Sequence, residues 1–151
     1  MQTLSIERTA VITAFKNADT SGKKLLDDLF PEQKLTGKIT DRVKTVEDAL
    51  LIKGITMSDL VKPGYTKEDI GRKKVELIIE VLNEGWYPNW DNHSEYKYYP
   101  WFNMSGSGLS YYVCDHAYSH SYVSSRLCLK SAELAKYIGT QFTKEYAEFM
   151  L

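Results

Sequence analysis

Several features that commonly reveal a protein's role are missing from this sequence of 151 residues. Two cysteines are too few for the disulfide framework of a small secreted domain. No apolar run approaches the roughly 20 residues that span a bilayer. The N-terminal segment also lacks the basic and apolar regions of a signal peptide. We therefore predict a cytoplasmic protein with no membrane partner.

An excess of charge of either sign is missing too. The 19 basic and 20 acidic residues give a formal net charge of −1. Such a balance supplies no general attraction to a nucleic-acid backbone or an anionic membrane. The one basic run, Arg72-Lys73-Lys74, lies among acidic residues in a predicted helix, and we interpret it as a solvated helix face. Nucleic acid is therefore not the expected partner.

Hydrophobic residues at helical spacing predict about five helices. The best defined of them begins at Thr66, where Asp69 completes a near capping box, and ends at Gly85. Its buried stripe comprises Ile70, Leu77, Ile78, Val81 and Leu82. The other predicted helices run from about Ser5 to Ala18, from the Asp19–Gly22 break to Phe30, from the Thr45 cap to Gly54, and from the Ser131 cap to Phe149.

Alternating residues predict two strands, Gly108–Asp115 and Tyr122–Leu129, joined by a polar loop over 115–121. Lys97–Phe102 is a candidate third strand, which Pro100 would confine to an edge. The predicted fold class is α+β, with about five helices packed on a small two- to three-stranded antiparallel sheet. We expect a single domain over 1–151, with a helical half to about residue 84 and an aromatic-rich β segment and closing helix over 85–151.

No motif for catalysis stands out, so we assign no catalytic residue and expect no cofactor. Zinc prefers thiolate and imidazole ligands, but their spacing here fits no common zinc module. The residues concerned are Cys114, His116, His120 and Cys128. Ser105 and Ser107 lie between glycines, but they precede a strand and do not form the strand-to-helix turn of a nucleophilic serine.

Aromatic residues are concentrated in one segment. Residues 86–122 hold 12 of the 19 aromatic residues, including all three tryptophans. Such side chains either pack a core or stack on a ligand or partner, and both interpretations stay open. The candidate binding surface comprises Trp86, Tyr87, Trp90, Asp91, Tyr96, Tyr98, Tyr99 and Trp101.

Sequence strings in and around this segment resemble a known family. They are Lys44-Thr45-Val46-Glu47-Asp48-Ala49, Leu82-Asn83-Glu84-Gly85-Trp86, Trp90-Asp91-Asn92, Tyr96-Lys97-Tyr98-Tyr99-Pro100-Trp101-Phe102 and Ser125-Arg126-Leu127-Cys128-Leu129-Lys130-Ser131. From about residue 25 onward the chain is similar to uncharacterised proteins of bacteriophages and phage-derived elements of gut anaerobic bacteria. The resemblance implies a phage or prophage setting within a bacterial host, and it carries no established activity.

Three functional hypotheses follow. The first is a non-enzymatic binding or interaction protein of phage origin, with a protein or small ligand bound by the aromatic segment and the 115–121 loop. The second is single-stranded nucleic-acid binding by stacking on the tyrosines, against which the even charge balance argues. The third is a small metal-dependent hydrolase built on Asp91, His93, Cys114, His116 and His120.

Overall fold

The structure is a computed structural model that describes residues 6–33, 35–106, 108–120 and 126–151. The chain divides into two compact units, Met1–Arg42 and Val43–Leu151. This division falls well before the change in composition near Gly85, so the single domain expected from the sequence stays a prediction. No described helix is both long and apolar enough to cross a membrane.

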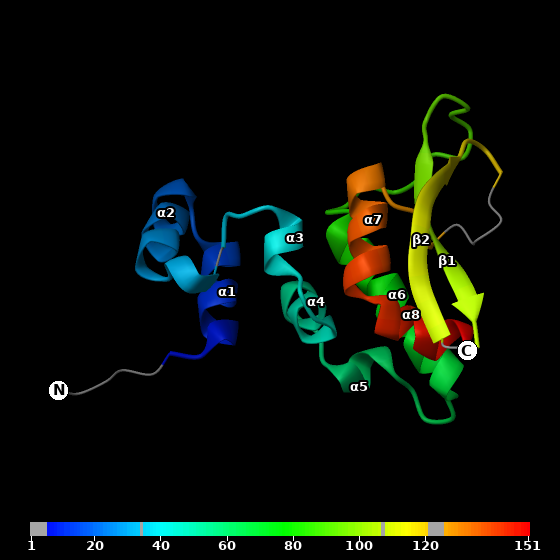
Figure 1. The fold of residues 1–151 in the computed structure, drawn as a ribbon. Helices are drawn as coiled ribbons and strands as arrows, with labels where there is room; N and C mark the ends of the chain where they lie inside the picture. The colour runs from blue at the N-terminus through cyan, green and yellow to red at the C-terminus, as the bar shows by residue number, and fades with distance from the viewer. Residues whose placement is uncertain (1–5, 34, 107, 121–125) are drawn as a thin grey trace. The chain divides into compact units, whose positions relative to one another are not determined.

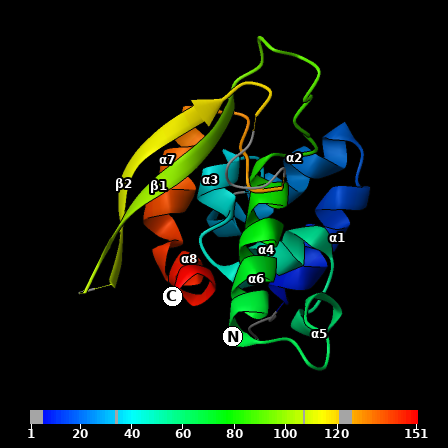
Figure 2. The same cartoon turned by 90° about the vertical axis from the view of Figure 1, so that its right-hand side faces the viewer.

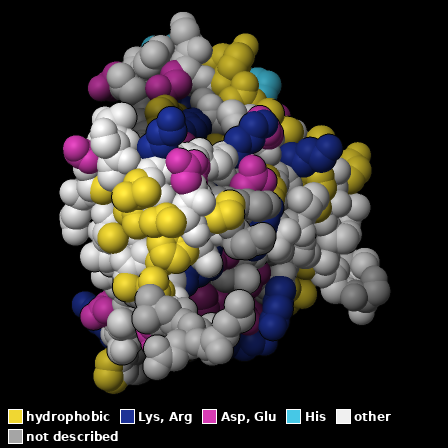
Figure 3. All heavy atoms as spheres, turned by 90° about the vertical axis from the view of Figure 1, so that its left-hand side faces the viewer, with side chains coloured by type: hydrophobic (Ala, Val, Ile, Leu, Met, Phe, Trp, Pro, Cys, Tyr) yellow, Lys and Arg dark blue, Asp and Glu magenta, His cyan; other side chains and the backbone are white. Residues whose placement is uncertain are grey.

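The first unit is entirely helical where it is described. It contains α1 (Arg8–Asn17), α2 (Thr20–Leu29), the 3-10 helix η1 (Pro31–Gln33) and α3 (Ile39–Arg42). Asp19 caps α2, since its side chain accepts a hydrogen bond from the amide of Gly22 at 2.8 Å. α2 buries none of its residues and exposes Leu25 and Leu29. The face drawn in Figure 3 shows hydrophobic side chains gathered among charged ones.

The second unit contains the remaining helices and both strands. Its helices are α4 (Val46–Lys53), α5 (Met57–Leu60), α6 (Lys67–Leu82), α7 (Ala132–Gln141) and α8 (Thr143–Met150). The predicted caps are confirmed: Thr45, Thr66 and Ser131 each accept a hydrogen bond from an amide in the first turn. Gly54 ends α4 in the left-handed conformation, with a φ of 72°.

A two-stranded antiparallel sheet is formed by β1 (Lys97–Ser105) and β2 (Gly108–Ala117). α7 and α8 pack against one face of this hairpin, and α6 packs beside α8 (Figures 1 and 2). The approach of α7 is close, because a Cβ atom at Gly139 would lie 2.9 Å from the Cβ atom of Pro100. The core of this unit includes Val75, Ile78, Leu82, Leu129, Ile138 and Phe142.

The α+β class is confirmed, although the helices and strands differ in number from those expected. Eight α-helices lie in the described residues. The four-residue α3 and α5 were not predicted, and the last predicted helix is two, since the chain leaves helical geometry at Phe142. Helices of one turn bury too little apolar surface to leave a periodic pattern in the sequence.

The expected strands are found only in part. Lys97–Phe102 does form a strand, but as part of β1 it pairs directly with β2 instead of adding a third strand. Of the predicted strand Tyr122–Leu129, residues 122–125 lie outside the described residues, and 126 and 127 form turn and bend. Only Leu129 pairs, through an isolated bridge to Tyr98. The register explains the difference: Ser105 pairs with Gly108, so the Ser/Gly stretch closes a tight hairpin rather than a loose loop.

Candidate ligand-binding groove

A groove of about 630 Å³ lies within the second unit, and part of the aromatic segment lines it. One side is the polar face of α6, another is the end of α4 with α5, and the third is the segment Trp86–Trp90. Asn83, buried at the end of α6, ties this helix to the segment that contains Cys128, another lining residue. Its side-chain amide donates to the carbonyl of Cys128 at 2.9 Å and accepts from the amide of Lys130 at 3.0 Å.

Three ion pairs lie along the helical side of the groove. Lys53 Nζ is 2.6 Å from Glu80 Oε1, which ties α4 to α6. Glu76 receives two cations, Arg72 through Oε1 at 3.1 Å and Lys73 through Oε2 at 2.8 Å. Partial burial alone would raise the pKa of the Glu76 carboxyl, but the hydrogen bonds and charges of Lys73 and Arg72 outweigh it and lower the pKa. Glu76 is therefore an ionised, fully engaged acceptor at neutral pH.

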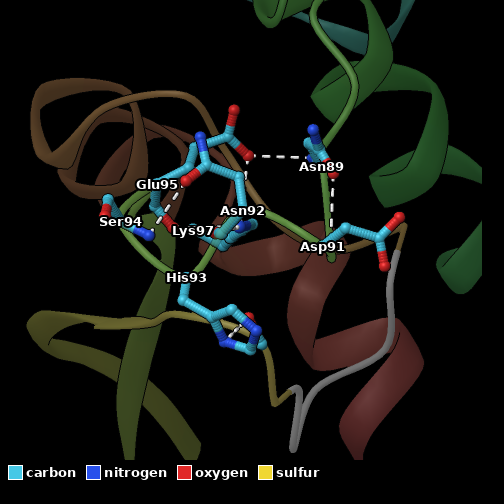
Figure 4. A network of polar contacts seen from close by, with 8 residues as sticks. Asn89, Asp91, Asn92, His93, Ser94, Glu95 and Lys97 are labelled. Carbon is cyan, nitrogen blue, oxygen red and sulfur yellow. Dashed lines mark hydrogen bonds and ion pairs between the residues drawn. The ribbon is translucent and has the colours of Figure 1, made fainter.

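The aromatic side of the groove is held by a buried lysine, Lys97, at the start of β1 (Figure 4). Its side chain is 0% exposed. Nζ donates to the carbonyls of Asn92 at 3.0 Å and Glu95 at 2.9 Å, and lies 3.2 Å from Glu95 Oε1. It also lies 5.4 Å from the ring centroid of Trp90, in cation–π geometry. One ammonium group thus fixes the loop and a ring of the groove at once.

Glu95 completes this arrangement, which we name the Lys97 latch (Lys97, Glu95 and the loop groups they bind). Its Oε1 accepts a hydrogen bond from the amide of Asn89 at 2.8 Å, and the side chain of Trp86 is close enough to help lower the pKa of this carboxylate. Burial acts to raise the pKa of Glu95, but the amide of Asn89, Lys97 and Trp86 together lower it. The latch therefore needs Glu95 as a carboxylate and Lys97 as an ammonium.

Short-range bonds shape the rest of the loop. Asn89 Oδ1 accepts from the amide of Asp91 at 3.0 Å, and Asn92 Oδ1 accepts from the amide of Ser94 at 3.0 Å. Both are turns of the kind that Asn side chains form with their own backbone. His93 Nδ1 lies 2.8 Å from Ser119 Oγ, which joins this loop to the segment after β2 (Figure 4).

The candidate binding residues separate into distinct places. Trp86 and Trp90, both half-buried, and Tyr87, 72% exposed, line the groove. Asp91 is exposed in the adjoining turn. Tyr99 is buried in the core, so it is not part of any exposed surface. Trp101 is exposed on β1 and does not line the groove.

Tyr96 and the half-buried Tyr98 belong to a second aromatic cluster around His116. The ring centroid of His116 lies 4.5 Å from that of Tyr96, 5.9 Å from Tyr98 and 5.7 Å from Tyr118. The hydroxyl groups of Tyr96 and Tyr118 are 3.4 Å apart, and this contact is the main cause that raises the pKa of Tyr118. The rings of this cluster pack against one another, and none of them lines the groove.

The metal hypothesis finds no supporting arrangement. Within the described ranges, no group of three or more His, Cys, Asp or Glu side chains is placed to hold a metal ion. Cys114 and Cys128 form no disulfide: the first lies on β2, and the second is buried beside the groove. His116 belongs to the tyrosine cluster, and His120 is exposed.

Sequence reasoning missed the charged members of the groove: Lys53, Lys73, Glu76, Glu80 and Arg126. A signal was present, because Lys73, Glu76, Glu80 and Asn83 recur at the three-to-four spacing that places them on one side of a helix. The run Arg72-Lys73-Lys74 was interpreted as a solvated face. Its members instead bind carboxylates, with Lys74 Nζ 2.6 Å from Glu148 Oε2 of α8.

Comparisons with protein-family models, with curated proteins and with solved structures give no match. The groove and its side chains are therefore the observations from which a function is argued.

Proposed function

We propose that this protein is a non-enzymatic binding protein of phage or prophage origin, and that its ligand occupies the groove between α6 and Trp86–Trp90. The observation that carries the proposal is a hollow of about 630 Å³ lined by Trp86, Tyr87 and Trp90. That volume lies within the range of small-molecule sites. The phage setting rests on the resemblance of the sequence strings described above.

The latch supports this proposal because it gives the groove a defined shape before any ligand arrives. A flexible loop would lose conformational freedom on binding, and a fixed one avoids most of that cost. Burying Lys97 requires several compensating contacts, and the loop beside the groove supplies them. A fixed aromatic surface beside a hollow is the expected result of selection for binding.

A binding role also fits the chemistry better than catalysis. The two carboxylates of the groove, Glu76 and Glu80, each lie in an ion pair. Lowering of the pKa of Glu76 makes it a poor general acid or base at neutral pH. Single-stranded nucleic acid remains the less favoured alternative, because Asp91, Glu95 and Asp115 lie near the tyrosines that would stack on it.

The test is an unbiased small-molecule library screened by thermal shift on the intact protein. Each hit is retested on Tyr87→Ala and on a matched variant, Tyr112→Ala. The two tyrosines are 72% and 67% exposed, but only Tyr87 lines the groove. We expect hits whose stabilisation is lost with Tyr87→Ala and kept with Tyr112→Ala. Hits that respond equally to both variants, or no hits at all, would overturn the proposal.

A further inference from the structure

Resting on the proposed function, we infer that the ligand of the groove is a small planar aromatic anion. This means one ring system that carries a phosphate or carboxylate group. The inference joins two properties of the groove: planar side chains on one side, and a surplus of cationic hydrogen-bond donors on the other.

The planar side chains are close together in the sequence and held in place. Trp86, Tyr87 and Trp90 reach the groove within five residues of chain, with Pro88 between them. Trp90 is held by the ammonium of Lys97, which lies 5.4 Å from its ring centroid, and Trp86 is half-buried four residues before it. Flat rings stack on such side chains with about 1–3 kcal/mol per ring, and with little dependence on ring identity. A flat ring system therefore suits this side better than a flexible aliphatic chain.

The surplus of donors follows from counting the polar groups of the opposite side. Two lysines line it, Lys53 and Lys73, beside the carboxylates of Glu76 and Glu80. Each lysine has three N–H donors, and each of these two makes one hydrogen bond to a carboxylate. The remaining N–H donors of Lys53 and Lys73 are available to a ligand.

The acceptors of the groove, in contrast, already hold hydrogen bonds, apart from Oε2 of Glu80, whose Oε1 binds Lys53. Both oxygens of Glu76 are bound, by Arg72 and Lys73. Both polar groups of the Asn83 amide are bound to the segment 128–130. A ligand rich in donors, such as a neutral sugar or an amine, would meet few acceptors here. A ligand with an anionic group would complete the hydrogen bonding of the lysines.

Size limits the ligand as well. A volume of about 630 Å³ holds one ring system with a short charged substituent. The loop residues that follow Trp90, from Asp91 to Glu95, include two carboxylates and neither lysine nor arginine. A long polyanionic strand that continued along this loop would gain no additional cations from it, so a small molecule fits better than a polymer.

Calorimetric titration of the intact protein at low salt separates the contribution of the ring to the affinity from that of the charge. The probes are adenosine 5′-monophosphate against adenosine and inorganic phosphate, and indole-3-acetate against indole and acetate. We expect at least one of the two aromatic anions to bind about tenfold more tightly than its uncharged ring compound, adenosine or indole. The corresponding anion without a ring, phosphate or acetate, should bind no more tightly than that ring compound. The two probe sets distinguish a phosphate-bearing ring from a carboxylate-bearing one.

A matched pair of variants tests whether a lysine of the groove contributes to binding of the anionic group. Lys53→Met removes a groove lysine paired with Glu80, and Lys130→Met removes a lysine outside the groove paired with Glu84. The two lysine side chains are similarly exposed, at 38% and 33%. We expect Lys53→Met to weaken binding of the aromatic anion by about tenfold and Lys130→Met to leave it within about twofold.

The contradicting outcomes are distinct. Equal affinity for the anion and its neutral counterpart would overturn the inference, as would equal loss in both lysine variants. Affinity that rises steadily from a mononucleotide to a twelve-nucleotide oligomer would assign the groove to a nucleic-acid strand instead. If the library screen finds groove ligands and none is an aromatic anion, the ligand class fails while the proposed function stands. If nothing binds the groove, both fail.

Discussion

Lys97 carries a charge at a position where its side chain is completely buried. Such burial costs several kcal/mol unless the charge is paired and hydrogen-bonded. Here the compensation comes from two carbonyls, the Glu95 carboxylate and the ring of Trp90. All four belong to the loop beside the groove, so this residue links the stability of the protein to the shape of its candidate site.

Lys97→Met should therefore lower the free energy of unfolding by about 2 kcal/mol, less than for a fully buried pair because Glu95 keeps partial exposure. It should also release Trp86 and Trp90 toward water. Urea unfolding gives the first quantity, and the wavelength of tryptophan emission in the native state gives the second. Lys130→Met, which breaks the exposed pair with Glu84, should change stability by under about 1 kcal/mol and leave the emission unchanged.

A second residue-scale prediction concerns Tyr146 of α8. Its hydroxyl is buried, and no described group accepts or donates a hydrogen bond to it, while burial raises its pKa. Removing an unsatisfied buried hydroxyl also removes its desolvation cost, so Tyr146→Phe should stabilise the protein by about 1 kcal/mol. Tyr137→Phe is the control, because the Tyr137 hydroxyl donates to the carbonyl of Val43 at 2.7 Å. That variant should destabilise by about 1 kcal/mol, and a loss for Tyr146→Phe would contradict the account.

At the scale of elements, α6 and α8 touch through a glycine. A Cβ atom at Gly71 would lie 2.8 Å from the backbone carbon of Glu148 and from the backbone nitrogen of Phe149. Alanine normally stabilises a helix interior by about 1 kcal/mol relative to glycine. Gly71→Ala should instead destabilise by about 1–3 kcal/mol, since backbone has to move.

Thermal unfolding of Gly71→Ala beside Gly106→Ala checks this contact. Gly106 has no heavy atom within 4 Å of an added Cβ, so its variant should stay within about 0.5 kcal/mol of the parent. Equal stability of the two variants would show that α6 and α8 do not pack as described.

Elements with local causes were predictable from the sequence. Thr66 with Asp69, Thr45 with Asp48, and Ser131 gave the starts of α6, α4 and α7, because a cap depends on residues three apart. The pairing of β1 with β2 was not predictable in the same way. It depends on which strand lies opposite, and the alternating pattern of Tyr122–Leu129 satisfies the same rule although its described residues, 126–129, form no strand.

The candidate site was predictable only in its aromatic part. Trp86, Tyr87 and Trp90 were identified from composition, and Tyr99 was included with them although it packs in the core. Lys53 and Arg126 could not be found, because they reach the groove from segments distant in sequence. Sequence proximity identifies a cluster, whereas a groove is assembled by tertiary packing.

At the scale of the whole molecule, the division at Arg42 has a measurable consequence. All three tryptophans lie in the second unit, whereas α1 and α2 lie in the first. Two compact units predict that urea unfolding followed by tryptophan emission and by helical circular dichroism gives transitions that do not coincide. Coincident transitions would support the single domain expected from composition.

The central claim is that Trp86 and Trp90 line a ligand site, and the indole N–H signals of the three tryptophans test it directly. Trp101, exposed on β1 and outside the groove, serves as the internal control. In a ¹⁵N-correlated NMR titration with the tightest-binding library ligand, the account predicts that the signals of Trp86 and Trp90 shift together and saturate while that of Trp101 stays in place. A shift at Trp101 alone, or equal shifts at all three, would contradict it.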